Sequence, residues 1–351
     1  MIKVLGLALY GPLAASTRYR LSQYVPGLAQ LGIDLQICHL LGDDYLRSKF
    51  TGGTLPLNSI LRAGLDRLID LYRLDKYDVA ILHCELFPLL PAWIERVLIR
   101  KPYIYDFDDA LYMKYRSGRL GVKLPFLEQK FDKIISGAAE VTAGNKVLAD
   151  YAEFYNPRTQ YLPTVVDTAR YLPQLARRGG HVFTVGWIGS PSTARYLSEL
   201  VAPLSTIGQE GSVRFIVIGG KAPFVPNVSV IELEWDAEKE LELINSFDVG
   251  VMPLPDDDWT RGKCAFKLIQ YMACAVPVIA SPVGANVHVV RQGCGLMAST
   301  RKEWEEALRN MRDQPNRRIE MGEVGRECVI QDYSLQRNLP VIASVICNAV
   351  R

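Results

Sequence analysis

Short apolar runs alternate with amphipathic segments along the first half of the chain. The runs at 2–9, 33–41, 79–83 and 103–107 are typical of strands covered on both faces. Helical apolar periodicity follows them at 18–31, 57–74, 92–99, 126–137 and 145–155, and 140–143 adds a short strand. Strands that alternate with helices in this way form a parallel, doubly wound sheet. The first half therefore predicts an α/β domain.

The second half repeats the pattern. Strands are expected at 181–188, 213–218, 228–232, 249–253 and 276–280, and helices at 193–208, 238–246, 265–273, 303–312 and 334–350. A polar, basic stretch at 167–180 ends in Gly-Gly and predicts a linker. We therefore expect two Rossmann-like domains, 1–170 and 171–351, facing a cleft in which ligands bind at the carboxyl ends of the strands.

Composition narrows the class of protein. The chain of 351 residues is 49% hydrophobic and 22% charged, as in ordinary globular proteins, and its net charge of +2 with no basic run argues against a nucleic-acid partner. Seven cysteines are dispersed without a CxxC pair, which is typical of reduced thiols in the cytoplasm. The N-terminal apolar run fits a buried strand better than a signal peptide, and no run is long enough to span a bilayer.

The segment 249–286 carries the strongest chemical signal. A strand leads through the acidic loop 255–258 and Gly262 into a helix, and a second strand begins at Pro277. A helix N-terminus presents unpaired N–H groups and a positive dipole end, so it forms an anion site. Lys263 and Lys267 add positive charge there. A nucleoside diphosphate is the natural ligand.

This segment resembles the donor-binding signature of GT-B glycosyltransferases, closest to glycosyltransferase family 4. The run MACAVPVIA at 272–280 matches the second part of that signature, and two glutamates eight positions apart precede it in the family. Here Gly262 falls on the first glutamate and Gln270 on the second. The resemblance implies that the amide oxygen of Gln270 accepts a hydrogen bond from a ribose hydroxyl. It also implies that the backbone amides at Cys264, Ala265 and Phe266 face the phosphates.

Further resemblances extend along the chain. Gly189, Ser190 and Thr193 occupy the first strand-to-helix turn of the second domain, where relatives bind phosphate; helix capping is the alternative role of their hydroxyls. The segment 165–171 resembles the one before the interdomain linker. The segment 333–335 resembles the start of the final helix, which in this fold crosses back to the first domain.

In the first domain, the strand 103–107 runs into three carboxylates, Asp106, Asp108 and Asp109. Relatives end this strand in His-Asp, and Asp108 and Asp109 fall on those two positions. Mutual repulsion should raise at least one pKa, which suits acid/base work or orientation of an acceptor. Helix capping with a solvated acidic loop is the alternative, and a metal site is a weaker one. We predict Asp108 and Asp109 as catalytic, with no cofactor and no metal.

Arginines open the first helix. We predict that Arg18 neutralises the leaving diphosphate, because a planar guanidinium suits phosphate. We assign Arg20 to acceptor binding with Tyr10, Gly11 and His83, which end the first and third strands. A surface arginine and a structural histidine are the alternatives.

The sequence thus predicts transfer of a glycosyl group from a nucleoside-diphosphate sugar to an acceptor hydroxyl, with retention by family resemblance. Family analogy favours a glycan or lipid-linked glycan acceptor in bacterial surface-polysaccharide synthesis, such as that of lipopolysaccharide. The basic, Leu-rich segment 57–77 either lies on an anionic membrane surface or packs on its own domain. The expected location is the cytoplasm, with peripheral contact at the inner face of the cytoplasmic membrane.

Two other classes stay open. One is a GT-B-fold sugar-nucleotide epimerase or phosphorylase, and the other a catalytically silent nucleotide-sugar-binding subunit. A dehydrogenase is disfavoured, because no strand is followed by GxGxxG and an acidic partner.

Overall fold

The computed structural model describes residues 1–50, 53, 56–116, 124–174 and 182–351. It divides the chain into two compact units. Unit 1 comprises Met1–Val165, Gly262–Cys264 and Leu335–Arg351, and unit 2 comprises Val166–Arg261 and Ala265–Ser334. The later part of the expected linker, 175–180, and the first residue of the strand expected at 181–188 lie outside the described residues. No helix in the described parts of the chain has the length and apolar character needed to cross a membrane.

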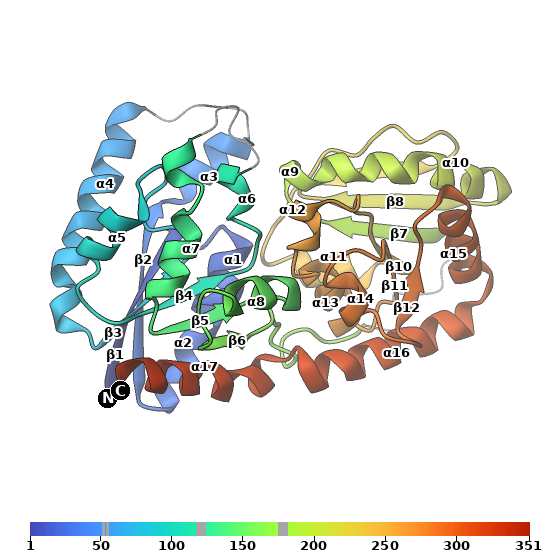
Figure 1. Cartoon of the computed structure of the whole chain (residues 1–351). Helices are drawn as coiled ribbons and strands as arrows, with labels where there is room; N and C mark the ends of the chain where they lie inside the picture. The colour runs from blue at the N-terminus through green and yellow to red at the C-terminus, as the bar shows by residue number, and fades with distance from the viewer. Residues whose placement is uncertain (51–52, 54–55, 117–123, 175–181) are drawn as a thin grey trace. The chain divides into compact units, whose positions relative to one another are not determined.

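Unit 1 is built on a parallel six-stranded sheet in the order β2-β1-β3-β4-β5-β6 (Figure 1). Its strands are β1 (Ile2–Tyr10), β2 (Ile33–Leu41), β3 (Val79–His83), β4 (Tyr103–Phe107), β5 (Glu140–Ala143) and β6 (Thr159–Tyr161). Its helices are α1 (Ala15–Arg20), α2 (Val25–Gln30), α3 (Asp43–Phe50), α4 (Leu57–Tyr72), α5 (Ala92–Leu98), α6 (Met113–Arg116), α7 (Lys130–Gly137), α8 (Lys146–Glu153) and α17 (Leu335–Val350), with 3-10 helices η1 (Ser22–Tyr24), η2 (Arg73–Lys76) and η3 (Pro125–Leu127).

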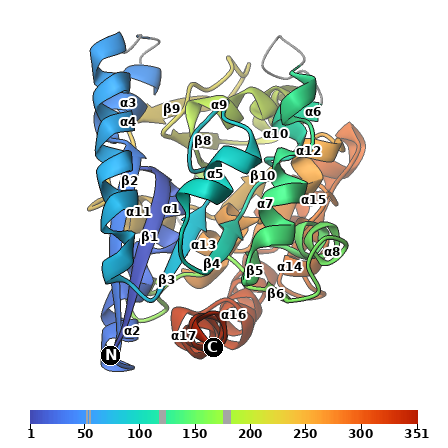
Figure 2. The same ribbon diagram turned by 60° about the vertical axis from the view of Figure 1, so that its left-hand side comes forward.

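Helices cover both faces of this sheet. Because right-handed crossovers run in opposite directions from β1 to β2 and from β2 to β3, the helices that follow these strands lie on opposite faces. The helices α2 and α17 pack together on one face, and α4, α5 and α7 lie on the other (Figures 1 and 2). The resulting core includes β1, β3 and β4 side chains and Ile342, Val345 and Ile346 of α17.

Unit 2 has the same plan, with the strand order β12-β11-β10-β7-β8-β9. Its strands are β7 (Phe183–Ile188), β8 (Val213–Ile218), β9 (Ser229–Leu233), β10 (Val249–Met252), β11 (Val278–Ala280) and β12 (Gly295–Met297). Its helices are α9 (Pro191–Ala194), α10 (Val201–Glu210), α11 (Glu240–Asn245), α12 (Asp258–Arg261), α13 (Phe266–Ala273), α14 (Asn286–Val289), α15 (Arg301–Asp313) and α16 (Pro315–Asp332), with the 3-10 helix η5 (Arg195–Leu200).

The expected doubly wound α/β class is confirmed in both units, while several helices differ from expectation. The single helix expected at 18–31 is three short ones, α1, η1 and α2. The helix α16 was not expected, since its buried positions include Gly322 and Gly325 rather than a full stripe of large apolar residues. A Cβ atom at Gly322 would lie 2.1 Å from the carbonyl oxygen of Ala275, so glycine permits the close approach of α16.

A buried charged cluster holds the loop after β3. The Nζ atom of Lys130, on α7, lies 2.9 Å from Oε1 of Glu85 and 2.9 Å from Oε1 of Glu95, and it donates to the carbonyl oxygen of Phe87 at 2.7 Å. Burial raises the pKa of Glu95 to about 7 even though Lys130 lowers it. Burial also raises the pKa of Glu85, but Lys130 and Lys114 more than offset this and leave that pKa below its ordinary value. Lys130 therefore binds both carboxylates, but it lowers the pKa below the ordinary value only for Glu85.

We predict that Glu95 makes stability depend on pH near neutrality. Its folded-state pKa is raised, so its contribution is complete below the unfolded pKa of about 4.3 and is lost as pH rises through about 7. The free energy of unfolding of the wild type, relative to Glu95→Gln, should fall by roughly 3 kcal/mol between pH 4.5 and pH 8, because one pKa unit corresponds to about 1.4 kcal/mol. Urea unfolding across this range measures it.

The matched control is Glu85→Gln, which removes the carboxylate that binds the same lysine with the opposite shift. This variant should be less stable than the wild type at pH 7, whereas Glu95→Gln should be at least as stable. Equal pH dependence in the wild type and Glu95→Gln would contradict the assignment.

Candidate active site

In each unit the strand order reverses at one point, where a doubly wound sheet binds its ligand at the carboxyl ends of the strands. In unit 1 this point lies between β1 and β3, and in unit 2 between β7 and β10. The predicted acceptor residues Tyr10, Gly11 and His83 end or follow β1 and β3. The predicted donor residues Gly189 and Ser190 directly follow β7.

Asp106 is the centre of a buried polar network at this edge of unit 1. It stands opposite His83 in the β3–β4 register, and Nδ1 of His83 lies 2.7 Å from its Oδ2. Arg20 donates to the same carboxylate through Nε at 3.2 Å and through Nη2, while Thr142 donates its hydroxyl at 2.6 Å. Burial raises the pKa of Asp106, but Arg20 and His83 outweigh it and hold the pKa well below its usual range.

Arg20 is only 2% exposed, and its Nη1 donates to the carbonyl oxygen of Leu162. All three of its nitrogens therefore donate inside the protein. His83, which is 1% exposed, is likewise held by Asp106.

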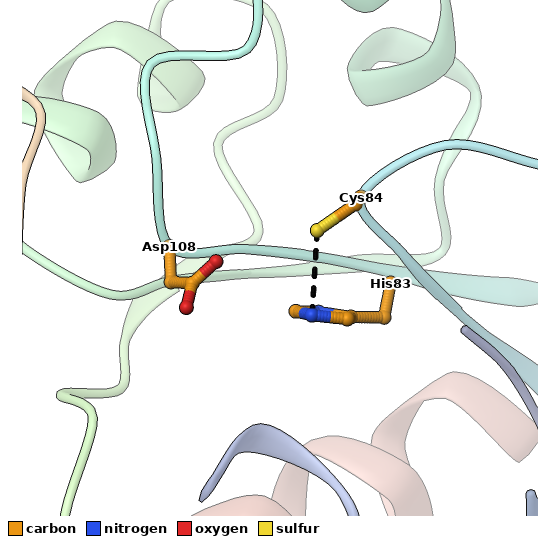
Figure 3. Close-up of side chains that lie close together, drawn as sticks. All are labelled: His83, Cys84 and Asp108. Carbon is orange, nitrogen blue, oxygen red and sulfur yellow. Dashed lines mark hydrogen bonds between the residues drawn. The ribbon is translucent and has the colours of Figure 1, made fainter. Parts of the chain in front are cut away.

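The hydrogen bond to Asp106 determines which nitrogen of His83 donates. Because an ionised Asp106 only accepts hydrogen bonds, Nδ1 of His83 carries a proton and donates it. Nε2 lies on the other side of the ring, 3.3 Å from Sγ of Cys84 (Figure 3). Cys84 adopts a left-handed conformation with φ of 68°, which is uncommon for a non-glycine residue. Burial and the surrounding carboxylates raise the pKa of its thiol well above the ordinary value.

Asp108 and Asp109 follow β4. Burial raises the pKa of Asp108, His83 lowers it, and Asp109 raises it again, so that it reaches about 6. Oδ1 of Asp109 lies 3.4 Å from Nζ of Lys263. Asp108 thus has the protonation behaviour that a proton-transfer group needs near neutral pH.

His83, Cys84 and Asp108 are also a candidate metal-binding group among the described residues. One ligand atom of each lies within 4.8 Å of the others (Figure 3). Imidazole, thiolate and carboxylate together suit zinc better than magnesium. The expectation that the reaction needs no metal stays a prediction.

The segment Gly262–Cys264 belongs to unit 1. Nδ2 of Asn145 donates to the carbonyl oxygen of Gly262 at 2.8 Å, and Sγ of Cys264 donates to that of Asp108 at 3.0 Å. A Cβ atom at Gly262 would lie 2.5 Å from Cβ of Ala110 and 3.0 Å from its backbone nitrogen. The glutamate that family 4 has at this position does not fit here without movement of the β4 loop.

Arg18 and Tyr10 lie around the loop after β1. Nη1 of Arg18 donates to the carbonyl oxygens of Pro12 and Leu13 at 2.8 and 2.7 Å. The ring of Tyr10 stacks on Tyr45, with centroids 6.0 Å apart. Arg18 thus braces the loop that contains Gly11.

In unit 2, Gly189 and Lys267 approach each other closely. A Cβ atom at Gly189 would come 2.7 Å from Cε of Lys267, and Nζ of Lys267 lies 5.5 Å from the ring centroid of Trp187. Ser190 precedes α9 but makes no capping hydrogen bond with its side chain; Oγ of Ser190 instead lies 2.9 Å from Oγ of Ser192. The hydroxyl of Thr193 donates back to the carbonyl oxygen of Ser190. Capping therefore does not occupy the side chain of Ser190.

The helix α13 starts beside this turn. Ala265 takes a left-handed conformation with φ of 53°, and the helix begins at Phe266. The dipole of α13 is positive at this end. Lys267 lies in the same turn, so this end of α13 suits an anion.

Gln270, one turn further along α13, contacts a carboxylate that the sequence analysis missed. Its Nε2 donates to Oε1 of Glu240 at 3.0 Å and to the hydroxyl of Tyr171 at 3.1 Å. Tyr171 donates to the same Oε1 at 2.5 Å, and Nε1 of Trp235 donates to Oε2 of Glu240 at 2.6 Å. Glu240 lies 30 residues upstream of Gln270, too far for any local motif to connect them.

These contacts fix the orientation of the Gln270 amide. Because its nitrogen faces Glu240 and Tyr171, its oxygen points away from both. Family 4 carries a glutamate at position 270. Here the glutamine at that position is hydrogen-bonded to the carboxylate of Glu240.

Residues 180–314 match the family model described as "Glycosyl transferases group 1". A comparison with curated protein sequences gave no match.

Several solved structures have the same fold. Sucrose-phosphate synthase from Thermosynechococcus elongatus superposes with a TM-score of 0.72 at 13% identity, covering 98% of each chain. HepE from Anabaena, in complex with UDP and glucose, has a TM-score of 0.71 at 13% identity, covering 99% of this chain and 100% of HepE. A UDP-forming trehalose-phosphate synthase from Burkholderia xenovorans has a TM-score of 0.66 at 10% identity over the whole of both chains. The chain has the fold of GT-B glycosyltransferases, and its residues 180–314 match the group 1 glycosyltransferase family model.

Proposed function

We propose that unit 2 binds a nucleoside-diphosphate sugar, with a UDP-sugar as the first candidate. The observation that carries this proposal is the meeting of Gly189, Lys267 and the N-terminus of α13 at the point where the strand order reverses. The diphosphate binds the N-terminal end of α13 and Lys267. The amide oxygen of Gln270 accepts a hydrogen bond from a ribose hydroxyl. HepE, whose fold is similar, has been crystallised with UDP-glucose.

Unit 1 binds the acceptor at the ends of β1, β3 and β4. The acceptor hydroxyl oxygen attacks the anomeric carbon, the bond from that carbon to the diphosphate oxygen breaks, and the diphosphate leaves with the electron pair. The hydroxyl proton passes to Asp108, whose pKa of about 6 leaves it largely ionised at neutral pH. Asp106, Arg20 and His83 support this edge of the sheet. The acceptor oxygen attacks on the face of the sugar from which the diphosphate leaves, so the proposed reaction retains the anomeric configuration. It uses no metal.

The acceptor we propose is a glycan on a lipid carrier, in the synthesis of a surface polysaccharide such as lipopolysaccharide. The protein then works in the cytoplasm at the membrane surface. A structure of TarM from S. aureus, which has a TM-score of 0.57 and covers 80% of this chain, contains alpha-GlcNAc-glycerol and UDP. That complex supports a glycan-bearing acceptor for this type of fold.

A thermal-shift panel tests the donor proposal. UDP-, GDP-, ADP- and dTDP-sugars are each added to the full chain, and one base class should raise the unfolding temperature, because a ligand that binds only the folded state stabilises it by about 2.7 kcal/mol at a hundred times its Kd. Absence of a shift with all four classes would refute the donor assignment.

Asp108→Asn should lower the rate of glycosyl transfer by about 10²–10⁴-fold, the usual contribution of a positioned proton acceptor. The donor-induced thermal shift should stay unchanged, since Asp108 belongs to unit 1. Glu153→Gln, which changes an exposed carboxylate in the same unit, is the control and should keep full activity. Equal transfer rates for Asp108→Asn and the control would remove Asp108 from the mechanism. A wild type that binds donor without transferring or hydrolysing it would favour the silent-subunit alternative.

Exchanging Gln270 and Glu240 tests whether Glu240 explains the glutamine at the position where the family has a glutamate. Gln270→Glu places two carboxylates about 3 Å apart and should destabilise unit 2 by a few kcal/mol through repulsion. The double variant Gln270→Glu/Glu240→Gln restores one amide and one carboxylate, so it should recover most of the lost stability and the donor-induced shift. Chemical unfolding of the four proteins gives the coupling. If Gln270→Glu alone is as stable as the wild type, the two side chains are not in contact.

A further inference from the structure

The helix α4 turns its apolar side chains toward solvent. Four of them follow at intervals of four, three and four residues, so at 3.6 residues per turn they form one stripe along the helix. Two more border the stripe on either side. These residues, which we call the α4 stripe, are Ile60 (46% exposed), Leu61 (62%), Leu65 (62%), Leu68 (45%), Ile69 (47%) and Tyr72 (82%).

The opposite side of α4, which packs on unit 1, carries an arginine. Arg67 is 1% exposed and donates from Nη2 to the carbonyl oxygen of Ala8 at 2.5 Å, while no partner within the described residues is found for its Nε and Nη1. Burial lowers the pKa of Arg67 to about 10. An ordinary surface helix buries its leucines and exposes its charges. In α4, Arg67 is buried together with Leu71, while the six side chains of the stripe are exposed, so most of the large apolar side chains of this helix do not pack on the core.

A contiguous row of exposed apolar side chains of this length marks a binding surface. The charged side chains around the α4 stripe indicate what this surface binds. Across 57–76 and the segment 92–100, which begins with α5 on the same face of the sheet, five exposed side chains are basic and two are acidic. The basic ones are Arg62, Arg73, Lys76, Arg96 and Arg100, and the acidic ones are Asp66 and Asp75.

Two aromatic side chains of these helices are also exposed. Tyr72 ends the α4 stripe, and Trp93 of α5 is 67% exposed next to Val97, which is 70% exposed. Tyrosine and tryptophan favour the boundary between lipid headgroups and acyl chains, and basic side chains favour anionic headgroups. A symmetric contact between two copies of the chain would instead bring the two sets of basic side chains together.

We infer that α4 lies flat on an anionic lipid surface. The α4 stripe enters the boundary between headgroups and acyl chains, and Arg62, Arg73 and Lys76 contact the phosphates. This gives unit 1, which we propose to bind the acceptor, access to a lipid carrier; its purpose rests on the proposed function, while the docking itself does not.

Vesicle flotation of the full-length protein without nucleotide tests the inference. Phosphatidylcholine vesicles that contain phosphatidylglycerol should carry the wild type upward, and pure phosphatidylcholine should carry at least about tenfold less. The variant Leu61→Gln/Leu65→Gln/Leu68→Gln should bind the anionic vesicles at least about tenfold more weakly, since glutamine keeps helix propensity but not apolar surface. High salt should also weaken the binding of the wild type to the anionic vesicles.

The matched control is Phe154→Gln, which removes a side chain of unit 1 that is 83% exposed but lies outside this surface. It should float like the wild type. The unfolding temperature and the donor-induced shift of the triple variant should equal those of the wild type, which separates loss of docking from loss of folding and from failure of the donor proposal. Flotation of the triple variant equal to that of the wild type would overturn the inference. So would a wild-type dimer that the triple substitution dissociates while vesicles carry neither protein, because the surface would then belong to a second copy.

Discussion

The buried pair of Arg20 and Asp106 is the constraint on which the candidate site of unit 1 depends. A lone buried carboxylate would be neutral, and a lone buried guanidinium would cost several kcal/mol. Together they keep Asp106 ionised inside the sheet, and the ionised carboxylate in turn fixes the tautomer of His83. The ends of α1, β3 and β4 are therefore joined through one carboxylate. Any change that neutralises Asp106 weakens the contacts that its carboxylate makes with Arg20 and His83.

The two missing glutamates of the donor signature have separate physical explanations. At position 262 the backbone passes so close to Ala110 that a Cβ atom would collide with it. At position 270 a carboxylate would face Glu240, which Tyr171 and Trp235 already hold as an acceptor. The first change is steric and the second electrostatic. Both follow from neighbours distant in sequence, so the departures from the signature are consistent with the rest of this fold.

The sequence predicted what local patterns can encode. Continuous apolar runs identified the parallel strands, because strands buried on both faces are apolar throughout. This reasoning did not predict the helix α16, because two of its buried positions are glycines that permit close approach. Residues at strand ends, such as His83 and Asp108, were identifiable because the carboxyl ends of parallel strands share one edge. The partners Thr142 and Glu240 were not, because only the folded chain brings them to Asp106 and Gln270.

Asp106 and Asp108 show how one strand end supports both structure and chemistry. They are two residues apart, yet their pKa values move in opposite directions. Burial acts on both in the same sense, so the difference comes from Arg20 and His83, which both hydrogen-bond to Asp106 directly. The paired carboxylate stays charged at every physiological pH and holds the fold. Asp108, close to a second carboxylate instead, keeps a pKa at which a proton can be taken up and returned, and separated pKa values of this kind distinguish a reacting group from its support.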